Sequence, residues 1–287
     1  MKINVEVGGT TVESTVIDNE AMFPEGPIFV KGKLYYVETG ANRVSVLDGT
    51  EKSTLFQRDG LGPNAVTTFC KGLLVAGYFS NSVLHISLNG ELIEEFDKAD
   101  DGTPMIGPND LVPDGIGGVY FTASGPWETD PIVGKVFHIS SSGRLRQMAD
   151  DIHYANGIVL ANEGTRLLVA ESEAFRIISF AIGEDGTLSD RRVFVRVPQA
   201  DKGAGPDGYP DGIKFGPDGN LYIAQYSSGR IAVVTPTGEF VRAYKFPAAG
   251  VSNLTFTPDG KSLVAMVIDD KSGAPWPGKL CVVDLVL

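Results

Sequence analysis

The sequence predicts an all-β protein, a six-bladed β-propeller whose last blade is closed by an N-terminal strand, built as a single domain over residues 1–287. Three observations predict this fold. Short apolar runs alternate with turn residues at spacings of about 8–12 residues, and these turns take up most of the 35 Gly and 17 Pro. One phrase recurs six times along the chain. Its period is close to the roughly 40–45 residues of a four-stranded propeller blade.

The repeated phrase is clearest at Pro210-Asp211-Gly212-Ile213, where a short strand is predicted to begin. We call the residue at the Asp211 position the anchor of each repeat unit. The six anchors are Glu25, Asn64, Asn109, Asn156, Asp211 and Ser252. Successive differences between these residue numbers are 39, 45, 47, 55 and 41. Self-similarity at such a period indicates a repeat architecture rather than a series of unrelated domains.

Within a unit, a tight turn follows the anchor strand and leads to a second apolar strand. Second strands are predicted at 33–37, 118–122, 166–170 and 220–224. Third strands are predicted at 43–47, 82–87, 134–139, 175–180, 230–234 and 278–283. Most units then end with a turn and an outer strand, as at 236–244. No stretch shows a convincing helical periodicity.

The last unit reaches only its third strand before the sequence ends. Residues 1–18 precede the first unit and contain strand-like runs at 2–6 and 11–17. We therefore expect this segment to supply the outer strand of unit six, which would close the ring and cover two sheet edges. No Pro/Ser/Gly-rich break separates the units, so a single domain is expected.

Composition excludes several classes of protein. The formal net charge of -12 argues against nucleic-acid binding, which needs clustered Lys and Arg. Cys70 and Cys281 both lie in apolar runs, so we expect buried free thiols and no zinc site. No apolar run is long enough to span a membrane, and the N-terminus lacks the pattern of a signal peptide. We expect a cytoplasmic protein, or one exported by a signal that this sequence does not contain.

The anchors are the candidates for function. Innermost blade strands begin beside the central channel, so the six anchors should converge at one end of it, where all of them offer oxygen. The alternative explanation is that the anchors only stabilise turns, because Asn and Asp side chains bond to nearby backbone amides. Glu25 does not fit this explanation, because Glu is not among the favoured turn residues. Two buried carboxylates, Glu25 and Asp211, would repel each other unless a cation or proton lay between them. Carboxylate and amide oxygens suit Ca²⁺, Mg²⁺ or Mn²⁺.

These motifs, with Pro24-Glu25-Gly26-Pro27, Pro108-Asn109-Asp110-Leu111 and Ala155-Asn156-Gly157-Ile158, resemble the senescence-marker-protein/gluconolactonase (regucalcin-like) family over 20–287. The resemblance implies a six-bladed propeller with one divalent cation and a lactone-hydrolysing activity. By position, Glu25, Asn156 and Asp211 match the metal ligands of the family. Asn109 matches a residue that binds metal or substrate, and Asp110 follows it. Asp211 also matches the proposed general base, with Asp110 as second choice.

One position departs from the family. Relatives that act on sugar lactones often carry Arg two residues before the motif Asn, where this chain has Gly107. Aromatic residues are expected in the loops at the same face: Tyr78, Phe79, Trp127, Tyr154, Tyr226 and Trp276. Blade packing is the alternative for all of them except Trp127 and Trp276, which lie in irregular loops where an indole is poor core material. His153 could face the pocket as well. Apolar walls would suit a lactone or ester that carries an alkyl or aryl group.

The sequence thus predicts a metal-dependent lactonase, a carboxylic-ester hydrolase with Ca²⁺ as the first choice and Mn²⁺, Zn²⁺ or Fe²⁺ as alternatives. The expected partner is a small lactone or ester, with no nucleic acid or membrane, and the protein is expected to be a monomer or weak homodimer. Organophosphate hydrolysis, a non-catalytic calcium-binding propeller and a metal-free propeller that uses Glu25 alone are the alternatives. No Gly-x-Ser-x-Gly elbow or phosphate-binding loop supports other hydrolase chemistry.

Overall fold

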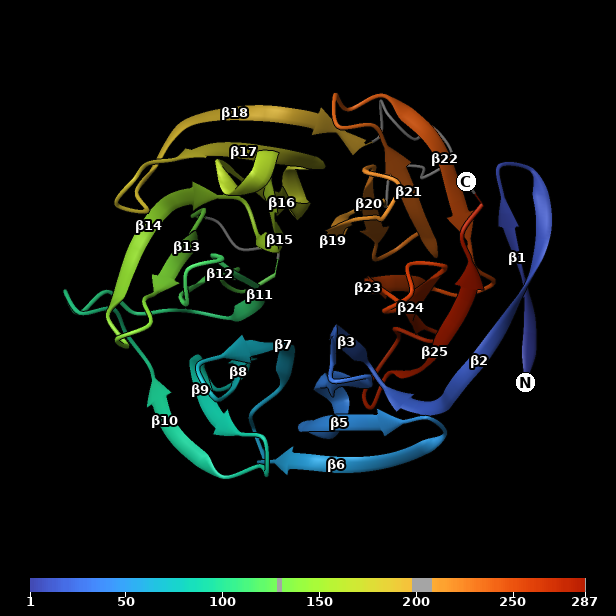
Figure 1. Cartoon of the computed structure of the whole chain (residues 1–287), viewed down its shortest axis with the longest axis horizontal. Helices are drawn as coiled ribbons and strands as arrows, with labels where there is room; N and C mark the ends of the chain where they lie inside the picture. Colours follow the sequence, from blue (N-terminus) through green and yellow to red (C-terminus); the bar gives the residue numbers. More distant parts are fainter. Residues whose placement is uncertain (128–130, 198–207, 287) are drawn as a thin grey trace.

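The computed structural model describes residues 1–127, 131–197 and 208–286. Within these ranges the chain is built from β-strands, and the helical elements that lie wholly inside them are three single 3₁₀ turns, which confirms the all-β prediction. The strands form sheets arranged in a ring around a common centre, as in a β-propeller (Figure 1). None of the helical segments in the described ranges has the length and hydropathy that a membrane-spanning helix needs.

Units one to four each form a separate four-stranded antiparallel sheet, with the strands in chain order. Unit one contains β3 (Pro24–Val30), β4 (Lys33–Glu38), β5 (Arg43–Asp48) and β6 (Glu51–Gln57). Unit two contains β7 (Pro63–Phe69), β8 (Gly72–Gly77), β9 (Ser82–Ser87) and β10 (Leu92–Phe96). Unit three contains β11 (Pro108–Pro113), β12 (Val119–Ala123), β13 (Gly134–Ile139) and β14 (Leu145–Ile152). Unit four contains β15 (Ala155–Ala161), β16 (Arg166–Glu171), β17 (Arg176–Ile182) and β18 (Leu188–Arg196).

Units five and six are joined in one nine-stranded sheet, so the described residues form five sheets rather than six separate ones. Unit five contains β19 (Pro210–Phe215), β20 (Leu221–Gln225), β21 (Arg230–Val234) and β22 (Phe240–Lys245). Unit six contains β23 (Gly250–Phe256), β24 (Ser262–Ile268) and β25 (Pro277–Asp284). The strands that connect the two units are β1 (Lys2–Val7) and β2 (Thr10–Met22).

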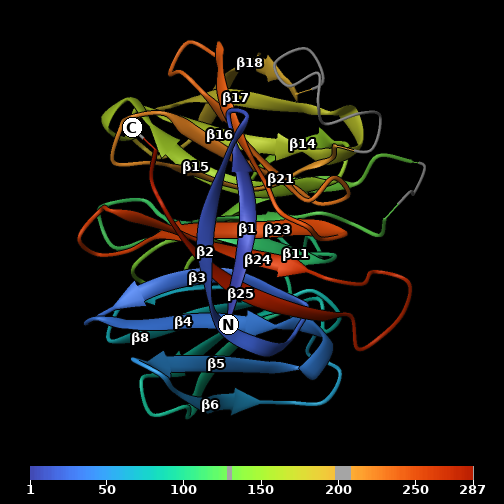
Figure 2. The ribbon, with the colours of Figure 1, turned by 90° about the vertical axis from the view of Figure 1, so that its right-hand side faces the viewer.

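The N-terminal strand takes the predicted outer place in unit six. β2 pairs antiparallel with β25, with Thr15 opposite Val282. The preceding strand β1 makes a contact that the sequence did not predict, because Glu6 and Val7 also pair with the edge of β22. Seen from the side, β1 and β2 form a long hairpin across the outside of the ring (Figure 2). This hairpin covers the outer edges of both units and merges their sheets.

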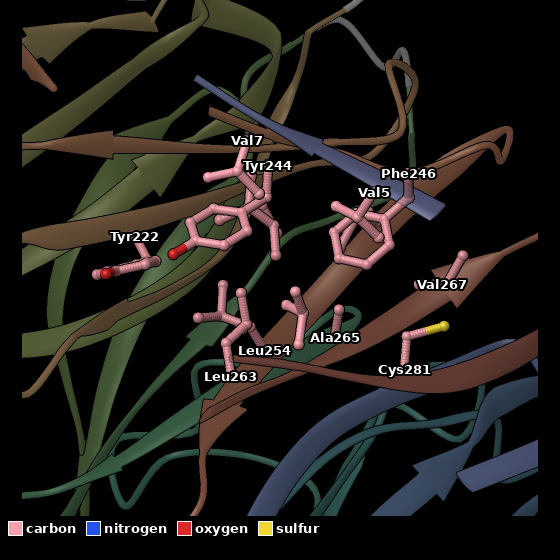
Figure 3. Packing of buried hydrophobic residues seen from close by; sticks show 14 of the residues in the cluster. Val5, Val7, Tyr222, Tyr244, Phe246, Leu254, Leu263, Ala265, Val267 and Cys281 are labelled. Carbon is pink, nitrogen blue, oxygen red and sulfur yellow. The ribbon is translucent and has the colours of Figure 1, made fainter. Parts of the chain in front are cut away.

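The core consists of apolar side chains packed between neighbouring sheets. In the largest cluster, Val5 and Val7 of β1 lie beside Tyr244 and Phe246 (Figure 3). Cys281 is part of the same cluster, and burial raises the pKa of its thiol to about 12. This thiol is therefore buried as predicted.

The prediction for the other cysteine is wrong. Cys70 is exposed, because the chain leaves β7 there and turns toward β8 with a positive φ of 51°. An apolar run predicts the strand correctly but does not show at which residue the turn carries the side chain out into solvent.

The innermost strands position the functional side chains. β3, β7, β11, β15, β19 and β23 lie nearest the channel (Figure 1). In each of them the pairing with the second strand shifts register at the anchor or directly beside it. Such bulges interrupt the regular alternation of side chains between the two faces of a sheet and re-aim one of them. The repeated phrase therefore encodes a repeated bulge.

Candidate metal centre and substrate cavity

A cavity of about 280 Å³ lies where the innermost strands converge. Five of the six anchors line it, each from a different unit: Glu25, Asn64, Asn109, Asn156 and Asp211. These residues are separated by up to 186 positions in the sequence and come together because every unit presents its anchor at the same end of the channel. The structure therefore places two carboxylates and three carboxamides around one small volume.

The sixth anchor, Ser252, does not line the cavity. Its Oγ donates a hydrogen bond to the carbonyl oxygen of Pro24 at 2.7 Å and lies 3.4 Å from that of Met266. A serine side chain is shorter than that of asparagine, and its single hydroxyl is used to join unit six to unit one. The next residue, Asn253, instead donates from Nδ2 to Glu25 Oε2 at 3.0 Å.

The two lining carboxylates are buried, and neither has a basic partner among the described residues. Burial is the main cause that raises the pKa of Glu25, and hydrogen bonds from the Gly26 amide and Asn253 only partly oppose it. Burial also raises the pKa of Asp211 well above its ordinary value, and the negative charges of Glu25 and Asp110 add to the effect. No Lys, Arg or His is among the described residues that line the cavity. Both carboxylates would be stabilised in their ionised form by an external cation.

Asp110 lies outside the cavity lining. Its Oδ1 accepts a hydrogen bond from the Leu111 amide at 2.8 Å, and its Oδ2 accepts one from the Ile158 amide at 3.2 Å. Its carboxylate therefore ties the innermost strand of unit three to that of unit four. The corresponding position in unit five is Gly212, where a Cβ atom would collide with the side chain of Asn253. Little space remains around the channel at this level.

The lining residues fit a hard divalent cation. Asn156 donates from Nδ2 to Ser172 Oγ at 3.2 Å, which leaves its carboxamide oxygen available. Within the described part of the chain, the Asn109 carboxamide bonds to no other group. No three His, Cys, Asp or Glu side chains in the described ranges are grouped as metal ligands, so amide oxygens would have to complete the coordination. Oxygen-only sets of this kind are typical of Ca²⁺ and Mg²⁺ sites.

Aromatic side chains form one wall of the cavity. Phe23 lies between Trp276 and Tyr226, with ring centroids 5.7 and 5.9 Å away. Trp127 packs edge to face against Tyr154 at 4.5 Å and lies 6.4 Å from Tyr226. The four aromatic residues predicted for the pocket, Trp127, Tyr154, Tyr226 and Trp276, all line it, as do Tyr78 and Phe79.

The prediction that His153 could face the pocket does not agree with the structure. His153 is not among the lining residues. Its ring forms an ion-pair contact with Glu173, and its backbone amide donates to Glu171 Oε1 at 2.9 Å. The next residue, Tyr154, has a positive φ of 62° and does line the cavity. The chain reverses at this point, so neighbouring side chains leave in different directions.

A sequence model described as the SMP-30/gluconolactonase/LRE-like region matches residues 23–268. The chain belongs to this family. The match covers the five lining anchors and all of the aromatic wall except Trp276. The resemblance found in the repeated motifs is therefore confirmed at the level of the family.

Relatives of this SMP-30/gluconolactonase-like chain include named hydrolases. Diisopropyl-fluorophosphatase of Loligo vulgaris is 24% identical over 282 residues, which cover 88% of this chain and 87% of that protein. Lactonase drp35 of Staphylococcus haemolyticus is 28% identical over 231 residues, 77% of this chain and 69% of that one. A solved gluconolactonase structure, XC5397 of Xanthomonas campestris, superposes with a TM-score of 0.78 at 21% identity and covers 95% of this chain and 90% of its own. The names of the sequence relatives support a hydrolase, and the superposition supports the fold.

Four lining residues of this family member escaped the sequence analysis. Phe23 and Tyr209 stand two residues before their anchors, as Tyr154 does, so the repeat alignment contained a signal for them. Thr39 and Ser172 directly follow the second strands of units one and four.

These two hydroxyl groups connect neighbouring units. Thr39 Oγ1 donates to the carbonyl oxygen of Pro63 at 2.7 Å, and Ser172 Oγ donates to that of Pro210 at 2.6 Å. Ser124 makes the same kind of bond to Ala155 at 2.7 Å. In each case the acceptor is the residue directly before the next anchor. A hydroxyl residue after the second strand therefore helps to hold the next anchor in place, and its recurrence is visible in the sequence.

Proposed function

We propose that this protein is a divalent-metal-dependent hydrolase that opens lactone rings, a carboxylic-ester hydrolase. One observation carries the proposal: two buried carboxylates and three carboxamides from five units face a single cavity that no basic side chain of the described residues lines. The similarity to a protein named as a lactonase supports the choice of reaction. We take the nine-stranded sheet as two blades, which gives a ring of six blades in a single domain.

Glu25, Asn156 and Asp211 would hold the cation, with Asn109 as a further ligand. Ca²⁺ is the first choice because every donor is a hard oxygen, and Mn²⁺, Zn²⁺ or Fe²⁺ are the alternatives. When bound, a divalent cation supplies positive charge that favours the ionised carboxylates and polarises the ester carbonyl as a Lewis acid. The proposal of a bound cation rests on the chemistry of this donor set.

The protein's own side chains would carry the proton transfer and the orientation of the substrate. Asp211 faces the cavity and would accept a proton from the attacking water. Asp110, the second choice for this role, is less suitable because both of its carboxylate oxygens accept bonds from backbone amides. Asn109, whose carboxamide has no partner among the described residues, would orient the carbonyl group of the substrate. The aromatic wall would exclude bulk water from the reacting atoms.

Organophosphate hydrolysis is the second candidate. It is favoured by the similarity to diisopropyl-fluorophosphatase, which extends over 88% of this chain. A general base and a site for a divalent cation would serve attack on phosphorus as well as on a carbonyl carbon. A panel of lactones and phosphotriesters assayed side by side would separate the two, and the higher kcat/KM would decide.

The substitution Asp211→Asn tests the mechanism. It keeps the shape of the side chain and removes its capacity to accept a proton, so turnover of the best lactone should fall about 10²- to 10⁴-fold at saturating metal. Asp218→Asn is the matched control. Asp218 lies in the same unit, in the turn after β19, where it accepts bonds from Asn220 and Tyr222, and it does not line the cavity.

Three outcomes would contradict the proposal. Near-wild-type turnover by Asp211→Asn would show that this carboxylate is not the base. Tight binding of Ca²⁺ without hydrolysis of any lactone or phosphotriester would favour a non-catalytic calcium-binding propeller. Full activity after dialysis against a chelator would favour a metal-free site.

A further inference from the structure

The aromatic wall is a feature of the whole ring. Each of the six units contributes at least one ring to it: Phe23, Tyr78, Trp127, Tyr154, Tyr226 and Trp276. Direct ring contacts link Trp276 to Phe23, Phe23 to Tyr226, and Tyr226 to Trp127. The wall is therefore a continuous aromatic surface above a polar floor, assembled from parts of the chain that are far apart in sequence.

Two of the tyrosines in the wall present only their rings to a ligand, because their hydroxyl groups are already bonded to the protein. The Tyr154 hydroxyl donates to the Tyr78 hydroxyl at 3.1 Å, and the Tyr78 hydroxyl donates to the carbonyl oxygen of Gly125 at 3.1 Å. This relay uses both donor hydrogens. On this side, the cavity therefore presents aromatic carbon atoms to a ligand rather than free hydrogen-bond donors.

Gly107 makes room for this arrangement. A Cβ atom at Gly107 would lie 2.8 Å from Cε2 of Tyr78, so the tyrosine ring occupies the space that a side chain at this position would need. The backbone does not by itself require glycine, because Phe23 and Tyr154 stand at the equivalent positions of units one and four with similar φ values of 52° and 62°. The glycine is required by its neighbour, Tyr78.

Unit two contains a second glycine whose side-chain space is filled by an aromatic ring. Gly62 stands two residues before its anchor, and a Cβ atom there would collide with the ring of Phe79. In both units a glycine before the anchor is paired with an aromatic ring from the loop after β8. The charge pattern agrees, because the described lining residues include no basic side chain. Lys271 stands with Nζ 5.8 Å from the centre of the Tyr226 ring but is not a lining residue.

We propose that this cavity selects lactones or cyclic esters that carry an aryl or alkyl substituent, discriminates against polyhydroxylated sugar lactones, and uses Tyr78 packed on Gly107 as its specificity-determining pair. The substituent would lie against the aromatic wall and bury apolar surface there. The hydroxyl groups of a sugar lactone would lose water and find rings in place of hydrogen-bond partners. The hydrolytic part of this inference rests on the proposed function, whereas the binding part does not.

Binding can be measured without catalysis and without mutation. The sequence contains two tryptophans, Trp127 and Trp276, and both line the cavity, so intrinsic fluorescence reports directly on its occupancy. The probes are 5-phenylpyrrolidin-2-one, a lactam that resists hydrolysis, and gluconic acid. We expect saturable quenching by the phenyl lactam and at least tenfold weaker binding of gluconic acid, with Ca²⁺ present throughout.

The catalytic arm compares kcat/KM for γ-phenyl-γ-butyrolactone and glucono-1,5-lactone. We expect the wild type to prefer the phenyl lactone at least tenfold. The double variant Tyr78→Ser with Gly107→Arg should shift this ratio at least tenfold toward the sugar lactone. Tyr120→Phe is the matched control, because Tyr120 is also buried and donates to a glycine carbonyl, Gly186, but lies outside the cavity. Its ratio should equal that of the wild type.

Failure of this inference and failure of the proposed function give different results. Saturable binding of the phenyl lactam with no hydrolysis of any lactone would refute the proposed function and leave the inferred ligand class standing. Hydrolysis that favours glucono-1,5-lactone, or a wild type whose fluorescence does not respond to the phenyl lactam, would overturn the inference. Because the binding measurement uses the wild-type protein, it decides the ligand class even if the double variant does not fold. A folded double variant with an unchanged ratio would overturn the role of Tyr78 and Gly107.

Discussion

Two groups of buried carboxylates in this protein have opposite environments. In the channel, burial raises the pKa values of Glu25 and Asp211, neighbouring carboxylates raise them further, and no basic side chain among the described residues offsets this. At the seam between β2 and unit one, Asp18 and Glu38 are also buried, but Lys52 bonds to both of them. Burial alone would raise their pKa values as well, yet hydrogen bonds from basic and hydroxyl groups outweigh it and lower them.

The two groups of buried carboxylates therefore differ in role: those at the seam are structural, and those in the channel are candidates for function. Arg43 bonds to Glu38 through Nε at 3.0 Å and Nη2 at 2.9 Å, and Ser45 Oγ donates to it at 2.6 Å. The seam thus contains its own counter-charges and joins the N-terminal strand to the first unit. The channel contains no such counter-charge among the described residues and opens to a cavity. Carboxylates that a fold leaves unpaired at a cavity are candidates for binding an external cation.

The largest expected effect comes from breaking the seam. Glu38→Gln removes the charge that Arg43 and Lys52 share and should lower the free energy of unfolding by about 3 kcal/mol, the lower end of the range for breaking a buried ion pair. Urea denaturation measures it. Glu95→Gln is the matched control, since Arg58 also binds Glu95 through two nitrogens but at the surface, where a loss below about 1 kcal/mol is expected. Equal losses in the two variants would contradict the inference that the ion pairs of the seam stabilise the fold more than a surface ion pair does.

Adding a cation should have the next largest effect, and only through the channel. At a Ca²⁺ concentration about 100-fold above Kd, binding to the folded state stabilises it by about 2.7 kcal/mol. For a chain of this size the melting temperature should rise by about 5–10 °C relative to a sample in chelator. Glu25→Gln should remove this rise, and Glu38→Gln should keep it. A rise of the same size in Glu25→Gln would place the bound ion elsewhere.

Neutralising a channel carboxylate should be stabilising when no cation is present. Glu25→Gln removes a carboxyl group that, on folding at pH 7, must either carry a buried charge or take up a proton. In chelator it should therefore raise the free energy of unfolding by about 1.5 kcal/mol, roughly the equivalent of one pKa unit. The same chemical change at Glu38 is expected to have the opposite sign. Destabilisation by Glu25→Gln in chelator would mean that the channel carboxylates are satisfied by the protein itself.

The sequence predicted the parts of this contrast that depend on local pattern. Turn residues and alternating apolar runs are local signals, so the repeat units were predicted and five of the six anchors line the cavity. The role of Ser252 was not predictable from the repeated phrase, because it depends on the carbonyl group of Pro24 at the other end of the chain. Non-local pairing also explains the extra contact between β1 and β22, which merges two units.

The seam was missed for a related reason. Asp18, Glu38 and Lys52 are ordinary charged residues in the sequence, and nothing near them indicates that β2 will bring Asp18 beside unit one. The aromatic wall was predicted only in part. Its further signal is that the position two residues before an anchor holds an aromatic residue in several units. Phe23, Tyr154 and Tyr209 occupy that position in three units, whereas Gly62 and Gly107 occupy it where a ring from another loop fills the space.

The smallest expected effect is a change in acid sensitivity at the seam. Lys52 Nζ lies 2.7 Å from Asp18 Oδ2, and the Tyr36 hydroxyl donates to the same oxygen at 2.6 Å. These bonds outweigh burial and lower the pKa of Asp18 from its ordinary 3.8, so the folded state binds a proton less readily than the unfolded state. The resulting stabilisation is complete above about pH 4 and is lost as the pH falls through the folded-state pKa.

Asp18→Asn should therefore flatten the acid limb of the stability profile. Between pH 5 and pH 3 we expect the wild type to lose about 1 kcal/mol more than this variant, measured by urea denaturation at each pH. Asp48→Asn is the control, because Asp48 pairs with Lys33 at an exposed position in unit one, and its acid limb should match that of the wild type. The same limb in Asp18→Asn and wild type would show that the Asp18 charge does not stabilise the seam. A flatter limb that is unchanged by Ca²⁺ would show that the seam and the channel titrate independently, as their separate partners require.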